Sequence, residues 1–140
     1  MQVKDDTFKE NPNIYLLGKK EHKGLPGYVA NFDACIIPYL LNEYTETVYP
    51  TKLNEYLIMG KPVIATSIPE VDKFDAENRN VIEVTKTKES FVAKIEEALR
   101  KKDTPEIKQE RINVALKSDW PSRIEKMSSH MEAVLKKKHL

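Results

Sequence analysis

The chain has 140 residues, of which 40% are hydrophobic and 32% are charged, and these values fit a single globular domain with an ordinary core. Its 23 lysine and arginine residues nearly balance its 22 aspartate and glutamate residues, so no overall field favours nucleic acid or an acidic membrane surface. No apolar run approaches the roughly 20 residues that cross a bilayer, and the start has no signal-peptide pattern. We therefore expect a cytoplasmic chain with no transmembrane segment and no nucleic-acid partner.

The first half of the chain alternates apolar runs with a helical pattern. Asn13–Gly18 is a short apolar run closed by glycine, which predicts a buried strand. The apolar residues from Leu25 to Phe32 have helical spacing, and Pro26 suits a first helical turn. The run Ala34–Pro38 predicts a strand covered on both faces, and its Cys35, the one cysteine of the chain, is expected to be a small buried residue.

The second half begins with a helix from Pro50 to Gly60, where glycine can adopt the left-handed conformation that ends a helix and Pro62 prevents continuation. Val63–Thr66 predicts a third strand, and a short turn-rich piece leads to a fourth at Asn80–Val84. Strands alternating with helices over brief connections indicate an α/β fold with a parallel sheet. The rest is expected to be helical, with helices at Lys88–Lys102, after Thr104, and after Asp119. The final helix carries one apolar stripe, which predicts packing against a core: Ile124, Met127, Met131, Val134 and Leu135.

The loop Leu41–Thr51 is the best candidate for a ligand site. In a parallel α/β sheet, ligands bind beyond the carboxyl ends of the strands, where helix N-termini meet anions. Thr51 and Lys52 are placed in a first helical turn, where a hydroxyl, backbone N–H groups and a positive charge suit a phosphate or diphosphate. Glu55 lies one turn deeper, and its residue type and position fit a structural surface glutamate as well as a ligand-binding one.

The run Pro50-Thr-Lys-Leu-Asn-Glu-Tyr-Leu-Ile-Met-Gly-Lys-Pro-Val-Ile-Ala-Thr66 resembles the donor-site signature of GT-B fold glycosyltransferases, especially the family 4 type. In that family, a helix bearing a glutamate runs into a glycine, a basic residue, a proline and a strand. The resemblance covers roughly residues 12 to 135. Asn13–Gly18 looks like the strand before the nucleobase pocket, and Trp120 with Arg123 resembles the start of the terminal helix.

The resemblance implies roles for individual residues. Glu55 matches the second glutamate of the family's pair, which holds the two ribose hydroxyls of the nucleotide. The first glutamate of the pair belongs eight residues earlier, where this chain has Thr47, so the catalytic residue stays unassigned between Glu46, Glu43 and Thr47. The positions that present backbone N–H groups to the diphosphate are Val48, Tyr49, Pro50 and Thr51. Pro50 has no N–H to offer, and the charge of Lys52 is a candidate substitute.

The family also implies an organisation. We expect a flexible or linker segment at 1–12 and a partial, Rossmann-like, nucleotide-sugar-binding domain of about four parallel strands at 13–140, with C-terminal helices at 104–138. Its ligand would be a nucleotide diphosphate sugar, with no cofactor and no metal. The resemblance also implies an N-terminal acceptor domain or a partner chain, which we expect to be missing here, so we expect this piece alone to be inactive.

The function implied is the donor-binding part of a hexosyltransferase-type enzyme of polysaccharide biosynthesis, which transfers a sugar to a glycan or other acceptor. The alternative is a noncatalytic α/β interaction module, or the donor-side subunit of a two-chain complex. An exposed edge strand would require such a partner.

Overall fold

A computed structural model of the chain describes residues 11–78, 81–118 and 120–138. Its sheet has three parallel strands in the order β1-β2-β3, with Cys35 opposite Val63 and Ile64 opposite Glu83. The strands are β1 (Cys35–Ile37), β2 (Val63–Thr66) and β3 (Glu83–Thr85). The expected α/β class, with a Rossmann-like parallel sheet between helices, is confirmed, but three strands form among the described residues where about four were expected.

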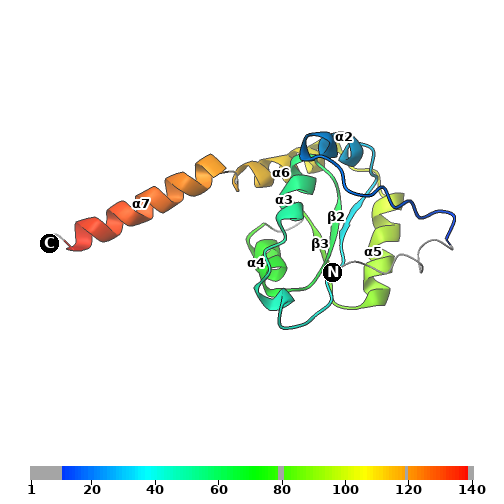
Figure 1. The fold of residues 1–140 in the computed structure, drawn as a ribbon, viewed down its shortest axis with the longest axis horizontal. Coiled ribbons are helices and arrows are strands. Elements are labelled where there is room, and N and C mark those ends of the chain that lie inside the picture. The colour runs from blue at the N-terminus through cyan, green and yellow to red at the C-terminus, as the bar shows by residue number, and fades with distance from the viewer. Residues whose placement is uncertain (1–10, 79–80, 119, 139–140) are drawn as a thin grey trace.

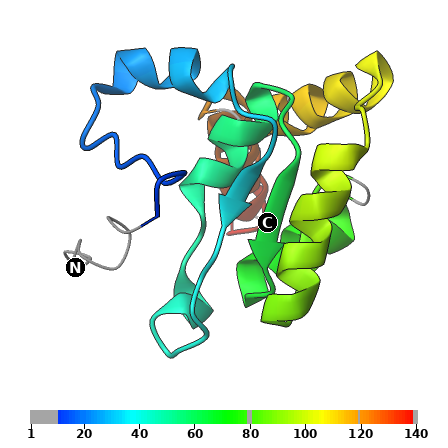
Figure 2. The same cartoon turned by 90° about the vertical axis from the view of Figure 1, so that its right-hand side faces the viewer.

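Helices cover both faces of the sheet. Figure 1 shows α3 and α4 on one side and α5 on the other, with α2 and α6 near one end of the strands and α7 extending away from the body. In Figure 2 the strands β1 and β2 run toward the loop that precedes α3, so this loop lies at their carboxyl ends. The helical segments are η1 (His22–Gly24), α2 (Leu25–Val29), η2 (Thr45–Thr47), α3 (Thr51–Ile58), α4 (Pro69–Glu77), α5 (Lys88–Arg100), α6 (Pro105–Leu116) and α7 (Trp120–Lys138).

The core forms where α3 packs on the central strand. Leu53 and Leu57, one helical turn apart, are both fully buried, so α3 turns one face to the sheet. Residues Val63–Ala65 of β2 are buried as well, as expected of a strand covered on both faces. Gly60 has a φ of 68° and ends the helix as its sequence position predicted.

The predicted strand at Asn13–Gly18 is wrong. This segment has no regular secondary structure, and its four large apolar residues are 40% to 78% exposed, Tyr15 the most. An apolar run forms a buried strand only where a neighbouring strand accepts its backbone hydrogen bonds and other elements cover its faces. Within the described residues β1 pairs with β2 alone, and the segment stays outside the sheet. The linker expected at 1–12 falls mostly on residues 1–10, which lie outside the described residues.

The predicted turn-rich piece between the third and fourth strands is also wrong, because it contains helix α4. Pro69 occupies the first turn, Glu70 and Asp72 place negative charge near the positive end of the helix dipole, and Val71 and Phe74 are buried. These are ordinary signals of a helix start and of an apolar face. The last strand starts later than expected, at Glu83, and Asn80, where it was predicted to begin, lies outside the described residues.

Helix α7 forms as predicted, but its apolar stripe does not pack on the core. Met127 and Met131 are 64% and 62% exposed, and Trp120 is 76% exposed. Helical periodicity indicates which face is apolar, and it does not identify what covers that face. Of the helices in the described part of the chain, none is both long and apolar enough to cross a membrane.

Candidate functional site

The loop between β1 and α3 is built around a buried threonine. The backbone N–H of Asn42 donates to Thr45 Oγ1 at 3.0 Å, and the backbone N–H of Thr45 donates to Asn42 Oδ1 at 3.1 Å. The Thr45 hydroxyl in turn donates to the carbonyl of Leu40 at 2.8 Å, and Thr45 is 5% exposed. Reciprocal side-chain to backbone bonds of this kind fix a turn. The loop therefore has a defined shape at the carboxyl end of β1.

Helix α3 starts from this loop without a side-chain cap. Its N-cap residue is Pro50, and no side chain accepts a hydrogen bond from its first turn. In contrast, Thr87 and Thr104 cap α5 and α6 by accepting from the N–H groups of Ser90 and Ile107. The first N–H groups of a helix have no acceptor within the helix. In α3 they belong to Thr51 and Lys52, both exposed.

Glu55 lies one turn into α3, on the face opposite the core. Its side chain is exposed, whereas Leu53 and Leu57 are buried. Together with His22 from η1 it borders a cavity of about 170 Å³ between the η1–α2 segment and α3. The other lining residues are apolar: Leu25, Pro26, Val29, Ile58 and Met59. A carboxylate beside an apolar cavity of this kind can bind a ligand that is polar at one end and flat and apolar at the other.

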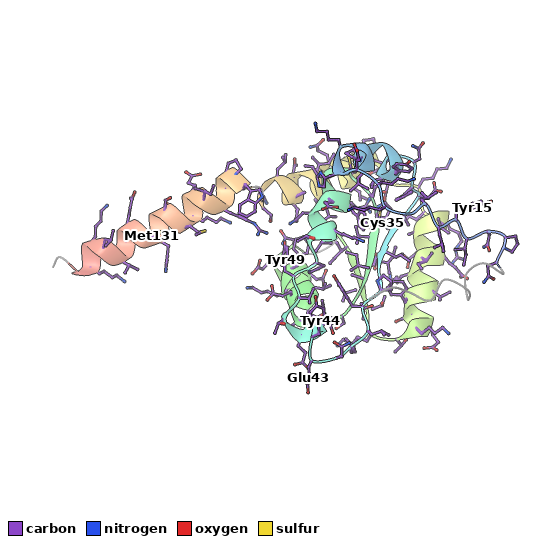
Figure 3. All side chains as sticks on the ribbon, in the orientation of Figure 1. Tyr15, Cys35, Glu43, Tyr44, Tyr49 and Met131 are labelled. Atoms are coloured by element: carbon purple, nitrogen blue, oxygen red, sulfur yellow. The ribbon has the colours of Figure 1, made fainter. Side chains whose placement is uncertain are left out.

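The candidates for the catalytic carboxylate lie elsewhere on the loop. Glu46 and Thr47 border a different cavity, of about 560 Å³, beside the start of α4 at Ile68 and Pro69. Glu43 is exposed at the far end of the loop, as Figure 3 shows. The structure thus brings Glu46 and Thr47 together and places Glu55 at another cavity, with His22.

Tyr49 and Val48 are half-buried just before α3. The Tyr49 hydroxyl accepts hydrogen bonds from Asn54 Nδ2 at 3.0 Å and from an Nη of Arg123 at 3.2 Å. The guanidinium carbon of Arg123 also lies 5.3 Å from the centre of the Tyr49 ring, within cation–π range. Sequence reasoning missed Asn54 and this role of Arg123. No sequence pattern near Asn54 indicates a contact with Tyr49, and Arg123 lies 74 residues from Tyr49 in the sequence.

Lys61, in the Gly-Lys-Pro-Val part of the motif, has a structural role. Its Nζ donates to the carbonyls of Ala30 at 2.7 Å and Phe32 at 2.9 Å, beyond the end of α2. A cation at the C-terminal end of a helix is favoured by the helix dipole. The lysine of the motif therefore ties α2 to the start of β2, at the amino end of the sheet.

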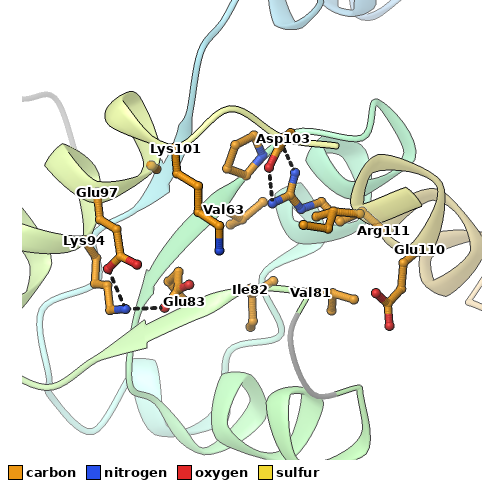
Figure 4. Close-up of a pocket in the computed structure, with 13 residues that line it drawn as sticks. Val63, Val81, Ile82, Glu83, Lys94, Glu97, Lys101, Asp103, Glu110 and Arg111 are labelled. Atoms are coloured by element: carbon orange, nitrogen blue, oxygen red, sulfur yellow. Dashed lines mark hydrogen bonds and ion pairs between the residues drawn. The ribbon is translucent and has the colours of Figure 1, made fainter. Parts of the chain in front are cut away.

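A further cavity, of about 340 Å³, opens at the amino ends of β2 and β3 (Figure 4). Arg111 of α6 reaches into this region, where it is ion-paired with Asp103 and donates to the carbonyl of Gly60 at 3.1 Å. These bonds fasten α6 to the end of α3. Four carboxylates and three cations line the cavity: Glu83, Glu97, Asp103, Glu110, Lys94, Lys101 and Arg111. This charge balance does not favour a diphosphate.

Comparison with known proteins assigns the chain to a class. Residues 2–101 match the family model described as Glycosyl transferases group 1. The chain therefore belongs to this family of glycosyltransferases, and the resemblance drawn from Pro50–Thr66 is confirmed.

One relative is a Bacillus subtilis (strain 168) protein provisionally named teichuronic acid biosynthesis glycosyltransferase TuaH. It is 32% identical over 121 residues, which cover 83% of this chain and 30% of that protein. The matched region thus spans less than a third of the relative's length. No solved structure matches the chain significantly.

Proposed function

We propose that this chain forms the donor-nucleotide-binding part of a glycosyltransferase that uses a nucleotide diphosphate sugar. Membership of the glycosyltransferase family supports glycosyl transfer as the chemistry. The observation that carries the donor role is the position of Glu55. It is exposed on α3 beside an apolar cavity, one turn from an uncapped helix N-terminus at the carboxyl edge of the sheet.

In this proposal each part of a nucleoside diphosphate has a binding group. The diphosphate meets the free N–H groups of Thr51 and Lys52, the positive end of the α3 dipole and the Lys52 charge. The Glu55 carboxylate accepts from both ribose hydroxyls, since its two oxygens can bind neighbouring donors at once. The base then lies toward Leu25 and His22, in the cavity that Glu55 borders.

Sugar transfer itself requires groups beyond this site. Glu46 and Thr47 border the cavity next to α4, so a transferred sugar that extends from the diphosphate toward α4 would meet them. Chemistry between two sugars also needs a cleft that orients both reactants and excludes water. We propose that another domain or partner chain completes this cleft and that this chain alone does not transfer hexose.

The name of the Bacillus relative refers to teichuronic acid biosynthesis. It supports a proposal that this enzyme, too, acts in polysaccharide biosynthesis with a glycan acceptor.

Calorimetric titration of the chain with uridine, guanosine and adenosine diphosphates and with inorganic diphosphate tests the donor role. We expect one nucleotide to bind with a dissociation constant of about 1 µM to 1 mM, the usual range for enzyme substrates, and to be preferred over inorganic diphosphate. Lys52→Met should weaken that binding about tenfold, equal to about 1.4 kcal/mol. Lys73→Met, at an exposed site on α4, is the matched control. A chain that binds every nucleotide equally weakly would instead be the noncatalytic interaction module.

A further inference from the structure

The contact between Arg123 and Tyr49 joins the last helix to the loop that precedes α3. Arg123 is itself held in place, because its Nε donates to the carbonyl of Ser118 at 3.0 Å. One Nη then donates to the Tyr49 hydroxyl, and the guanidinium faces the Tyr49 ring. A planar guanidinium that both stacks on a ring and donates in a fixed direction orients its partner more strictly than a flexible ammonium.

Tyr49 receives a second bond from within α3. Asn54 Nδ2 donates to the same hydroxyl at 3.0 Å, while Asn54 Oδ1 is buried and accepts no hydrogen bond within the described structure. A buried amide oxygen without a donor costs about 1–3 kcal/mol. One polar atom of the Asn54 side chain is thus left without a partner. The bond from Asn54 Nδ2 to Tyr49 is what orients the side chain. Tyr49 is fixed from α3 on one side and from α7 on the other.

Tyr49 leads directly into the first turn of α3. Tyr49 is bonded to Pro50, and the carbonyl of Pro50 accepts from the N–H of Leu53 at 2.9 Å. Thr51 and Lys52 lie between these two residues. A small change in the backbone at Tyr49 would therefore change the direction of the N–H groups of Thr51 and Lys52, and displacements of about 1 Å are enough to weaken a preorganised site strongly.

We propose that Arg123 is a positioning residue for the donor site, which acts through Tyr49 on the diphosphate-binding turn of α3. This inference rests on the proposed function of that turn. It assigns to the start of α7 a part in donor binding, although Arg123 itself does not touch the donor.

The test compares Arg123→Met, Tyr49→Phe and the double variant with the unaltered chain. Arg100→Met, the same change at an exposed position of α5, is the control. Two quantities are measured: the dissociation constant of the preferred nucleoside diphosphate, and the hydrogen-exchange rate of the Leu53 amide, which reports on its bond to Pro50. Thermal unfolding checks that each variant remains folded.

Arg123→Met should weaken nucleotide binding about tenfold and accelerate Leu53 exchange, with a melting temperature close to that of the control. The double variant should lose less affinity than the two single substitutions lose together, because both substitutions remove the bond between Arg123 and Tyr49 and residues in contact are not additive. Arg123→Lys, which keeps the charge and loses the fixed geometry, should recover only part of the affinity.

Unchanged affinity in Arg123→Met, or additive effects of the two substitutions, would overturn the inference. If the unaltered chain binds no nucleotide, the proposed function fails, and unchanged Leu53 exchange would then reject the positioning role separately.

Discussion

Cys35 opens β1 with 3% of its surface exposed, opposite Val63 of the central strand. Burial raises the pKa of its thiol to about 11 from an ordinary value of 9.0, and the nearby Lys61 charge opposes this change only in part. The thiol is therefore neutral in the folded protein over the physiological range, as expected of a packed residue rather than a reactive one.

A pH-dependent stability follows from this shift. Because the folded-state pKa lies above the unfolded-state value, the neutral thiol stabilises the fold fully below pH 9, and this contribution is lost as the pH rises through about 11. The loss amounts to roughly 2–3 kcal/mol. Urea unfolding between pH 8 and pH 11 should show a smaller decline for Cys35→Ala than for the unaltered chain. Equal declines would mean that Cys35 ionises normally in the folded state.

At the residue scale, local sequence signals predicted the features that neighbouring residues determine. The burial of Cys35 followed from its apolar run, and the end of α3 at Gly60 followed from residue type and position. The contact of Tyr49 with Arg123 and that of Arg111 with Gly60 could not be predicted in this way. Their partners lie far away in the sequence, and only the packing of α6 and α7 brings them together.

Among the elements, α3 was predicted most fully, since both its start next to Pro50 and its end before Gly60 agree with the sequence prediction. Helix α4 was missed although its signals were present, because proline and acidic residues after Thr66 were interpreted as a turn. The error at Asn13–Gly18 is the opposite one, because a strand was predicted where the structure has no regular secondary structure. The apolar composition of this segment favours a strand, but composition does not supply the neighbouring strand that β structure requires.

The end of α3 depends on Gly60, and this can be tested. Its φ is 68°, and a Cβ there would lie 3.4 Å from Lys108 Cβ on α6. Gly60→Ala should destabilise the protein by about 1–2 kcal/mol, the usual cost of a left-handed conformation with a side chain. Gly27→Ala is the matched control, because a Cβ on Gly27 of α2 meets nothing within 4 Å.

We expect Gly27→Ala to be neutral or to stabilise the protein by up to about 1 kcal/mol, since alanine favours a helix over glycine. Urea unfolding of both variants measures the difference. Equal effects of the two substitutions would show that the conformation at Gly60 adapts to a side chain.

At the scale of the whole molecule, the described chain is a small sheet with open surfaces. The outer edge of β1 pairs with no strand among the described residues, the loop residues Leu40 and Leu41 are 76% and 66% exposed, and α7 extends from the body with its apolar stripe uncovered (Figure 1). Large exposed apolar surfaces indicate interaction sites. This arrangement agrees with a chain that matches 30% of its relative and with our proposal that a further domain completes the catalytic cleft.

The proposed donor site depends most on Glu55, which we propose binds the ribose. Calorimetry with the preferred nucleoside diphosphate and its 2′-deoxy form, on the unaltered chain, on Glu55→Ala and on the exposed control Glu96→Ala, tests this directly. Removal of the 2′-hydroxyl should weaken binding about tenfold or more in the unaltered chain and in Glu96→Ala, because a hydrogen bond to a charged group contributes about 1.5–3 kcal/mol. In Glu55→Ala the two nucleotides should bind equally. A 2′-hydroxyl effect of the same size in Glu55→Ala would contradict the account, because another group would then bind the ribose.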